Sequence, residues 1–251
     1  MATKKVGLQI YSIRDIYSEN PAEAFKLIKD SGYDAVDMFG GTSMDAKDLK
    51  KLFDDNGLEC CGWHMGIDYA DSTEKLEEFV AYNKVIGNKY LIVPGLPGEY
   101  MKDKDTWAKA AEKLNEIAAQ LKKHGMYTGL HSHSQEFAKL DGTDDYPWDI
   151  VAKNTVEDVV LQLDMGNTLQ AGVEPVEVLK KYQNRYRTIH MKPFSKTAGF
   201  KVAIGDDDID WAETVKYCKT SGNTEYFIVE YEEEDAKTGI KTCLDNLRKY
   251  L

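Results

Sequence analysis

The chain is poor in cysteine, and the spacing of its cysteines excludes two kinds of site. Its 251 residues include four, Cys60, Cys61, Cys218 and Cys243. Four irregularly placed cysteines are too few for a disulfide scaffold, and without a C-x-x-C pair they form no zinc or redox motif. We therefore expect four buried, reduced thiols.

Long apolar runs are also missing. No segment approaches the ~20 apolar residues of a membrane-spanning helix. The first residues, MATKKVGLQIYS, enter a strand-like pattern almost at once, which leaves no room for the apolar region and cleavage site of a signal peptide. These absences predict a cytoplasmic protein with no membrane partner.

Basic side chains are outnumbered. The sequence has 32 Lys and Arg against 43 Asp and Glu, a formal net charge of -11. A surface this acidic repels phosphate backbones, and no basic block provides an electrostatic footprint for nucleic acid. We therefore do not expect a nucleic-acid partner.

What the chain does have is a regular alternation of strand-like and helical patterns. The strand-like segments are Lys5–Tyr11, Tyr33–Met38, Leu58–His64, Lys89–Val93, Met126–His133, Asp158–Asp164, Tyr186–His190 and Glu225–Tyr231. The helical segments are 20–32, Met44–Asn56, Ser72–Ile86, Thr106–His124, Tyr146–Lys153, Glu174–Tyr182, Asp210–Ser221 and Ala236–Leu251. No linker, low-complexity segment or internal repeat interrupts them.

This alternation predicts parallel strands joined by helical crossovers. Eight such units in a chain of this length favour a single-domain (β/α)₈ TIM barrel over residues 1–251, and such a chain is long enough for one sizeable core. An open doubly wound sheet is disfavoured because no G-x-G-x-x-G follows the first strand.

Chemically active side chains collect where the predicted strands end, which is where such barrels carry their active sites. The stretch YTGLHSHSQEF is the densest, and alternation along a strand would point His131 and His133 to one face. The full set is His64, His131, His133, Glu136, Asp164, His190, Lys192 and Glu230.

Imidazole and carboxylate groups on four successive strands suit one divalent transition ion, and Mn, Co, Zn, Fe and Ni all remain open. In the alternative interpretation, the histidines are ordinary core residues, and Asp164 and Glu230 cap helices or pair with Lys192 and Arg187.

Motifs along the chain resemble the xylose isomerase-like TIM-barrel superfamily of sugar (phosphate) isomerases and epimerases. The matching stretches are VGLQIYSIRD (Val6–Asp15), GLHSHSQEF (Gly129–Phe137), LQLDMGN (Leu161–Asn167), IHMK (Ile189–Lys192), IGDDDIDW (Ile204–Trp211) and IVEYE (Ile228–Glu232). The resemblance implies one divalent ion held by Asp164, His190, Glu230 and a residue of strand five. We favour His131 for that fourth position, with Glu136 as the alternative.

The resemblance also implies a sugar or sugar phosphate isomerase or epimerase that acts through an enediolate next to a carbonyl. We assign acid/base and oxyanion roles to Glu136, Glu230, His133 and Lys192, because proton transfer and charge stabilisation need such groups. We expect His64, Tyr11 and Trp107 to contact a small sugar-like substrate. Substrate identity stays open because, among other departures, strand two ends in Asp37 where relatives often carry Glu.

Other functions remain possible. The same first step would serve a dehydratase or lyase acting on a keto-sugar or inosose, since an enediolate can expel a leaving group. A non-catalytic sugar-binding barrel is less favoured. An AP-endonuclease-like repair nuclease is also less favoured. The resemblance implies that such nucleases carry a histidine three residues after the position of Asp164, and this chain has Asn167 there. A homo-oligomer is possible.

Overall fold

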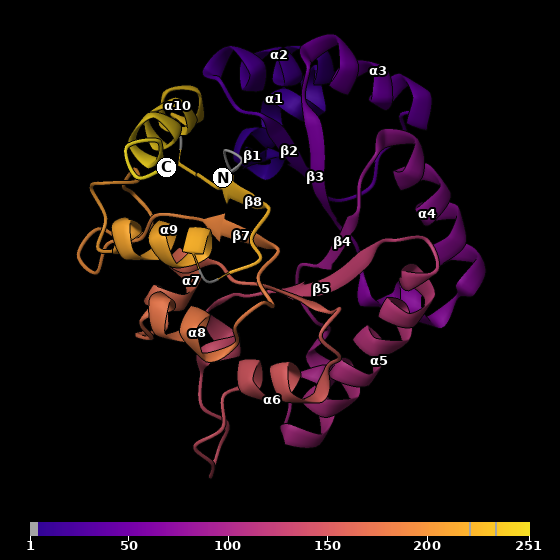
Figure 1. The fold of residues 1–251 in the computed structure, drawn as a ribbon, viewed down its shortest axis with the longest axis vertical. Helices are drawn as coiled ribbons and strands as arrows, with labels where there is room; N and C mark the ends of the chain where they lie inside the picture. Colours follow the sequence, from indigo (N-terminus) through magenta and orange to yellow (C-terminus); the bar gives the residue numbers. More distant parts are fainter. Residues whose placement is uncertain (1–4, 221, 234) are drawn as a thin grey trace.

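Eight parallel strands form the centre of the computed structural model, which describes residues 5–220, 222–233 and 235–251 (Figure 1). The strands are β1 (Lys5–Gln9), β2 (Ala35–Met38), β3 (Glu59–His64), β4 (Tyr90–Val93), β5 (Tyr127–His131), β6 (Val160–Gln162), β7 (Thr188–Met191) and β8 (Tyr226–Val229). Sequence neighbours pair from β1 to β6, β7 pairs with β8, and β8 returns to β1. A bridge between Asp164 and His190 connects the β6 and β7 segments, so the predicted TIM barrel is confirmed.

Helices surround the strands as an outer ring (Figure 1). The α-helices are α1 (Arg14–Glu19), α2 (Pro21–Ser31), α3 (Ala46–Asn56), α4 (Thr73–Ile86), α5 (Lys104–Lys122), α6 (Pro147–Asn154), α7 (Met165–Gln170), α8 (Pro175–Lys181), α9 (Trp211–Thr220) and α10 (Ala236–Leu247). Short 3₁₀ helices are η1 (Ile10–Ile13), η2 (Ile67–Asp71), η3 (Gly98–Tyr100) and η4 (Ser134–Phe137). The predicted end of the ninth α-helix, Ser221, lies outside the described residues.

Local capping decides where the helices begin. The α5 helix starts at Lys104 because Asp103 and Thr106 form a capping box, in which each side chain accepts from the other residue's backbone N–H. The Ser72 side chain likewise accepts from the N–H of Lys75 and caps α4. These caps shift the predicted helix starts by one or two residues without changing the architecture.

Four strands end earlier than predicted, and this changes how the site is built. The β1 strand stops at Gln9, whose Oε1 accepts the N–H of Tyr11 and turns the chain into η1. The β5 strand stops at His131, so His133 belongs to the loop that leads into η4. Asp164 and Glu230 also follow the strands β6 and β8 instead of lying within them.

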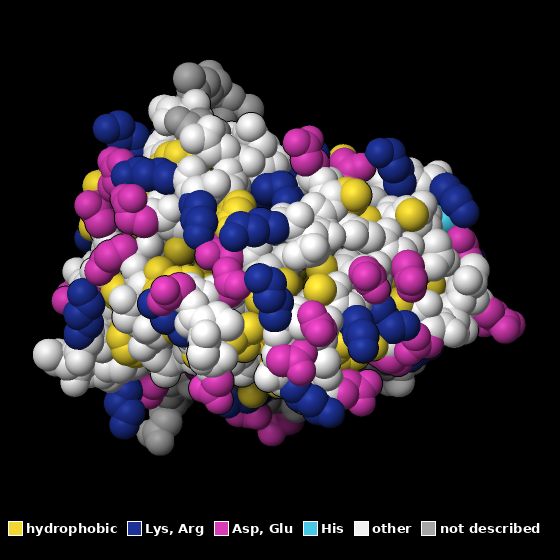
Figure 2. Space-filling model, turned by 90° about the horizontal axis from the view of Figure 1, so that it is seen from below, with side chains coloured by type: hydrophobic (Ala, Val, Ile, Leu, Met, Phe, Trp, Pro, Cys, Tyr) yellow, Lys and Arg dark blue, Asp and Glu magenta, His cyan; other side chains and the backbone are white. Residues whose placement is uncertain are grey.

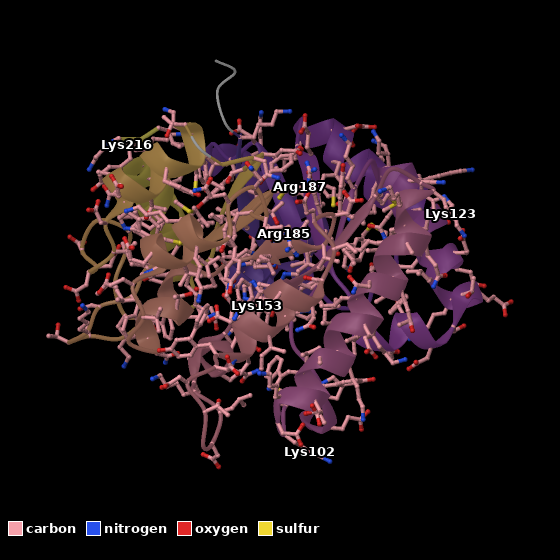
Figure 3. All side chains as sticks on the ribbon, turned by 60° about the horizontal axis from the view of Figure 1, so that its bottom comes forward. Lys102, Lys123, Lys153, Arg185, Arg187 and Lys216 are labelled. Atoms are coloured by element: carbon pink, nitrogen blue, oxygen red, sulfur yellow. The ribbon has the colours of Figure 1, made fainter. Side chains whose placement is uncertain are left out.

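The N-terminal end of the barrel is closed by aromatic side chains. Tyr90, Tyr127 and Tyr226 are the first residues of their strands, and the rings of Tyr90 and Tyr127 stack at 5.6 Å. The guanidinium of Arg187 lies 4.3 Å from the centroid of the Tyr127 ring and forms an ion pair with Glu225 (Figure 3). A cavity opens at the opposite end, where the strands finish.

Charges of both signs are mixed over the face shown in Figure 2, and hydrophobic side chains appear there only between them. On the side shown in Figure 3, Lys102, Lys123, Lys153 and Lys216 lie far apart. Neither view shows a concentrated basic surface. In the part of the chain that the structure describes, no helix combines the length and the apolar character needed to cross a bilayer.

Candidate metal centre and active site

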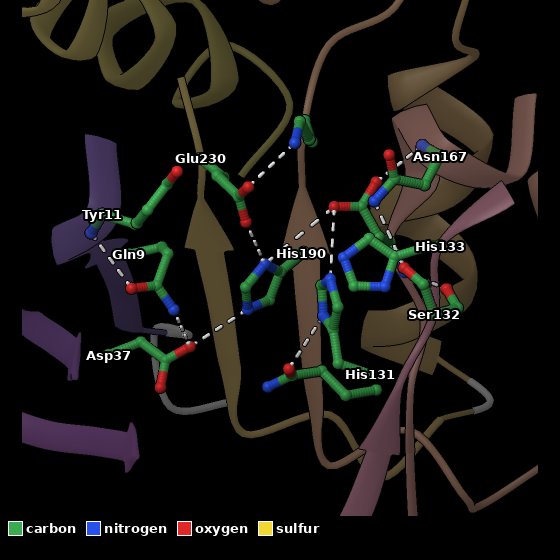
Figure 4. A network of polar contacts seen from close by, with 12 residues as sticks. Gln9, Tyr11, Asp37, His131, Ser132, His133, Asn167, His190 and Glu230 are labelled. Carbon is green, nitrogen blue, oxygen red and sulfur yellow. Dashed lines mark hydrogen bonds and ion pairs between the residues drawn. The ribbon is translucent and has the colours of Figure 1, made fainter. Parts of the chain in front are cut away.

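Four side chains from the ends of β5 to β8 converge at the open end of the barrel (Figure 4). They belong to His131, Asp164, His190 and Glu230, all buried, and one ligand atom of each lies within 4.8 Å of the other three. His131 therefore joins the cluster that the sequence predicts, whereas Glu136 does not. The donor set, two imidazoles and two carboxylates, is typical of divalent transition metals.

The Asp164 carboxylate provides the test of whether an ion fits. Its Oδ1 accepts the N–H of Asn167 at 2.7 Å, which makes Asp164 the N-cap of α7 as in the alternative interpretation. Its Oδ2 is buried without any hydrogen-bond partner and lies 4.0 Å from both His131 Nε2 and His190 Nδ1. An unpaired buried carboxylate oxygen is costly, and a cation between these atoms would remove that cost.

Burial also makes the ionised form of the Asp164 carboxyl unfavourable when no metal ion is near. It raises the pKa of this group to about 7, although the charge of Lys192 opposes the shift. A neighbouring cation would favour the ionised form. Helix capping alone therefore does not account for the environment of Asp164.

Both histidines are oriented by partners on the nitrogen that faces away from the cluster. Gln162 donates through Nε2 to Thr188 Oγ1 at 2.9 Å, so its Oε1 accepts from His131 Nδ1 at 3.0 Å. This leaves the lone pair of His131 Nε2 facing Asp164. The pKa of His131 is held well below its usual range by burial and by neighbouring His190, which keeps the ring in the neutral form that binds metals.

His190 is held in a similar way by Asp37. Asp37 Oδ2 lies 3.0 Å from His190 Nε2 and also accepts from Gln9 Nε2 at 2.9 Å. Burial lowers the pKa of His190, but hydrogen bonds to Asp37 and Glu230 outweigh this and raise the pKa to about 10. At this pKa His190 carries a proton on each ring nitrogen. A bound metal ion would replace the proton on Nδ1, while Nε2–H would keep its hydrogen bond to Asp37, as in carboxylate–histidine–metal triads.

A cavity of about 560 Å³ opens directly above the cluster. The predicted site residues that line it are Tyr11, His64, His131, His133, Lys192 and Glu230. Lys192 Nζ donates to Glu230 Oε1 at 2.8 Å and to Glu232. Burial raises the pKa of Glu230, but the Lys192 charge and the His190 hydrogen bond hold it well below its usual range, so this carboxylate stays ionised.

The structure separates the roles of His133 and Glu136. The ring of His133 lines the cavity, 4.9 Å from that of His131, and its Nδ1 is buried without a partner. Glu136 is fully buried, does not line the cavity, and accepts the backbone N–H of His133 at 2.7 Å. The predicted acid/base role of Glu136 would need the carboxylate in the cavity, but η4 turns it back onto the loop that carries His133.

Trp107 is a correction to the predicted substrate contacts. Its side chain is only 1 % exposed and packs in the hydrophobic core from α5, and it is not among the residues that line the cavity. The helical spacing of Trp107 with Leu114 and Leu121 indicates that all three face the core from α5, and this periodicity predicts the position of Trp107 correctly. Tyr11 does reach the cavity, and its ring packs edge-on against Phe39 at 4.9 Å.

The structure adds four residues to the candidate site to which sequence reasoning gave no role there: Gln9, Asp37, Gln162 and Glu232. Gln9, Asp37 and Gln162 lie within buried strands, and a polar residue in a buried apolar strand is the signal that could have found them. Gly62 adds a further sign, since a Cβ there would lie 2.4 Å from Asp37 Oδ1. Glu232 follows Glu230 at the same strand end and lines the cavity.

Comparisons with known proteins agree with this architecture. The family described as "Xylose isomerase-like TIM barrel" matches residues 25–250. Inosose dehydratases are similar in sequence: one from Clostridium perfringens (strain ATCC 13124) is 25% identical over 242 residues, covering 82% of this chain and 80% of the relative. One from Clostridium beijerinckii is 24% identical, covering 99% and 97%.

A solved structure of a sugar phosphate isomerase/epimerase from Parabacteroides distasonis superimposes with a TM-score of 0.84. The match covers 98% of each chain at 22% sequence identity. At this identity the superposition shows a shared fold.

Proposed function

The chain belongs to the xylose isomerase-like TIM barrel family, and from this membership and the geometry of its site we propose a divalent-metal-dependent enzyme acting on a keto-sugar or inosose. The proposed reaction begins with removal of a proton from the carbon next to the carbonyl. One observation carries the proposal: Asp164 Oδ2 is buried, has no partner, and faces the ligand nitrogens of His131 and His190.

His131, Asp164, His190 and Glu230 are the residues that would hold the ion. A bound divalent ion supplies Lewis-acid stabilisation of negative charge on a substrate oxygen. The donor set accommodates Mn, Co, Zn, Fe or Ni. Asp37 and Gln162 fix the two imidazole rings in place.

The proton transfers are assigned to groups that line the cavity. Glu230 is ionised beside Lys192 and is the proposed base. Lys192 stays protonated, because the Glu230 and Asp164 carboxylates raise its pKa against the effect of burial, and it can stabilise an oxyanion. His133 approaches the cavity from the β5 side and is the proposed proton donor, while His64 and Tyr11 contact the substrate.

For the net reaction we place dehydration first. The inosose dehydratases match most of this chain, whereas the isomerase/epimerase structure shares the fold. The acidic residues that line the cavity, Glu230 and Glu232, follow one strand and share Lys192. Both carboxylates therefore lie on the β8 side of the cavity, and His133 lies on the β5 side. In the proposed dehydration, a carboxylate on the β8 side removes the proton, and His133 protonates the hydroxyl group that leaves as water. This reverses the order of the two reactions expected from the sequence.

Isomerisation or epimerisation is the second candidate. It starts with the same proton removal and ends when the proton returns to the neighbouring carbon or to the opposite face. His133 could deliver that proton from its neutral ring, which lines the cavity, since burial lowers the pKa of the imidazole.

One experiment separates these outcomes. The protein is stripped of metal, reloaded with each of the five ions in turn, and incubated with an inosose in D₂O while NMR spectra are recorded. Dehydration predicts an unsaturated or diketone product, and epimerisation predicts recovered polyol ketone that carries deuterium. If no ion produces product or deuterium exchange above the level of Asp164→Asn, the inosose proposal is wrong, and a keto-sugar panel then decides whether proton removal itself fails.

A further inference from the structure

A second cavity of about 360 Å³ adjoins the one above the metal ligands. The two share the lining residues Gly40, His64, Met65 and Gly66. We call the second cavity the aromatic annex and define it by its remaining walls, Gly41, Thr42, Trp63, Tyr69, Phe79 and Tyr82. These walls come from the loops after β2 and β3, from the end of β3 and from α4 (Figure 1). The annex therefore opens at the same end of the barrel as the site.

Four of the residues that line the annex are aromatic: Tyr69, Phe79 and Tyr82 are half-buried and offer ring surface to it, whereas Trp63 is 1 % exposed and supports them from the core. Trp63 packs edge-on against Phe79 at 5.5 Å and against Tyr82 at 5.6 Å, and Tyr69 lies 5.1 Å from Phe79. Such rings bind another ring well, because offset and edge-to-face pairs gain energy beyond the buried area. The volume of the annex, about 360 Å³, is within the range of small-molecule binding sites.

Several polar atoms in these walls are already used. Trp63 Nε1 donates to the carbonyl of Gly40 at 2.8 Å, and the Tyr82 hydroxyl donates to the carbonyl of Met44 at 2.9 Å. No Asp, Glu, Lys or Arg is among the residues that line the annex, and the charge nearest to a wall in the contacts of its rings is Lys75 Nζ, 4.2 Å from the centroid of the Tyr69 ring. A hydroxyl-rich ring would lose its hydrogen bonds with water here and regain few of them. The main cavity is the opposite case, since Lys192, Glu230, Glu232 and His133 all face it.

From this division we infer that the substrate carries an aryl group, which binds in the aromatic annex while its keto-sugar portion faces the metal ligands. This inference rests on the proposed function in one respect, because the proposed function is what places the sugar portion in the main cavity. His64, which lines both cavities, then lies at the junction of the two parts. The substrate class is an aryl-substituted keto-sugar, in contrast to a free polyol ketone.

Gly41 allows the annex to be filled without disturbing the fold. Gly41 lines the annex, and a Cβ built there has no heavy atom within 4 Å, so Gly41→Trp adds an indole to this wall without a clash at its base. Gly98 in η3 has the same open surroundings and lines neither cavity, so Gly98→Trp is the matched control.

The probes are phenyl β-D-glucopyranoside, methyl β-D-glucopyranoside and phenol, with binding to the metal-loaded protein measured by calorimetry and ligand-observed NMR. We expect the phenyl glycoside to bind about tenfold more tightly than the methyl glycoside, because an aromatic ring is removed from water. Gly41→Trp should abolish this preference and the binding of phenol, and Gly98→Trp should retain both.

The inference is overturned if the parent shows no phenyl preference, if neither phenyl glycoside nor phenol binds at millimolar concentration, or if Gly41→Trp leaves the preference intact. These outcomes are separate from the D₂O exchange experiment. Metal-dependent exchange without a phenyl preference refutes only the annex, and a phenyl preference without exchange on any ketone refutes only the proposed reaction.

Discussion

His190 has a carboxylate on each ring nitrogen. Asp37 Oδ2 lies 3.0 Å from Nε2, and Glu230 Oε2 lies 2.7 Å from Nδ1. Asp37 is itself fixed by Gln9 and lies against Gly62, where no side chain intervenes. At the scale of single residues, Asp37 therefore sets both the orientation and the basicity of a proposed metal ligand without touching the ion.

Replacing Asp37 by Asn should weaken metal binding by about tenfold or more, because the charged acceptor for His190 Nε2–H is lost while its size is kept. The measurement is a titration of the metal-free protein with Co²⁺ or Zn²⁺ in competition with a chelator. Asp34→Asn is the control, since Asp34 immediately precedes β2, at the end away from the site, and accepts the N–H of Val6. Equal affinities in parent and Asp37→Asn would contradict this role.

Glu136 provides a prediction for pH. Burial raises the pKa of its carboxyl from the ordinary 4.5 to about 7, against hydrogen bonds that lower it. The folded state therefore holds this proton more tightly than the unfolded state. Its contribution to stability is complete below pH 4.5 and is lost as the pH rises towards 7.

Glu136→Gln should remove this dependence while it keeps an acceptor for the N–H of His133. Between about pH 5 and pH 8, the metal-free parent should lose about 2–3 kcal/mol more unfolding free energy than the variant. Denaturant unfolding at both pH values measures the difference. Glu99→Gln is the control, because Glu99 is exposed in η3. Parallel pH profiles for parent and Glu136→Gln would refute the assignment.

The residues of the site differ in how far sequence could place them. His131, Asp164, His190 and Glu230 could be predicted because they end consecutive strands of a recognisable barrel. Asp37 and Gln162 could not, because one polar residue in a buried strand does not reveal its partner, and both partners are distant in sequence. The position of Glu136 outside the cavity could not be predicted either, because η4, which reverses the side chain, has no strong local signal.

At the scale of elements, alternation of patterns was enough to find every strand and most helices. It could not find where β5, β6 and β8 end, because pairing with the neighbouring strands decides those ends. The short helices α1 and α7 were also missed. Asp164 starts α7 by accepting the N–H of Asn167, a role that competes with its interpretation as a metal ligand in the sequence.

The contact of β5 with β6 depends on Gly129. It pairs with Val160, and a Cβ at Gly129 would lie 2.2 Å from the Val160 carbonyl oxygen. Gly129→Ala must therefore separate two strands near the point where the barrel closes, two residues before His131. We expect a loss of about 1–3 kcal/mol in unfolding free energy, as for other overpacked cores.

Denaturant unfolding of the metal-free protein measures this loss. Gly98→Ala, at a glycine with open surroundings, should stay within about 0.5 kcal/mol of the parent. A Gly129→Ala variant as stable as the parent would show that β5 and β6 separate at little cost.

At the scale of the whole molecule, the proposed ion would connect the part of the barrel that has the least backbone pairing. The β6 and β7 strands meet through an isolated bridge between Asp164 and His190, and both residues are proposed ligands. The other two ligands follow or end the flanking strands β8 and β5. Binding that requires all four segments in place favours the folded state over the unfolded one.

Metal should therefore raise the melting temperature. At about a hundredfold excess over its dissociation constant, a ligand that binds only the folded state adds about 2.7 kcal/mol, which for a chain of this size corresponds to roughly 5–10 °C. Differential scanning calorimetry of metal-free protein, with and without each of the five ions, measures the shift. Asp164→Asn should lose it, because the unpaired Oδ2 is replaced by an amide nitrogen that cannot coordinate, while Asp34→Asn should keep it. A parent whose melting temperature responds to none of the ions would exclude a metal held across β5 to β8, and the carboxylate of Asp164 would then need another partner.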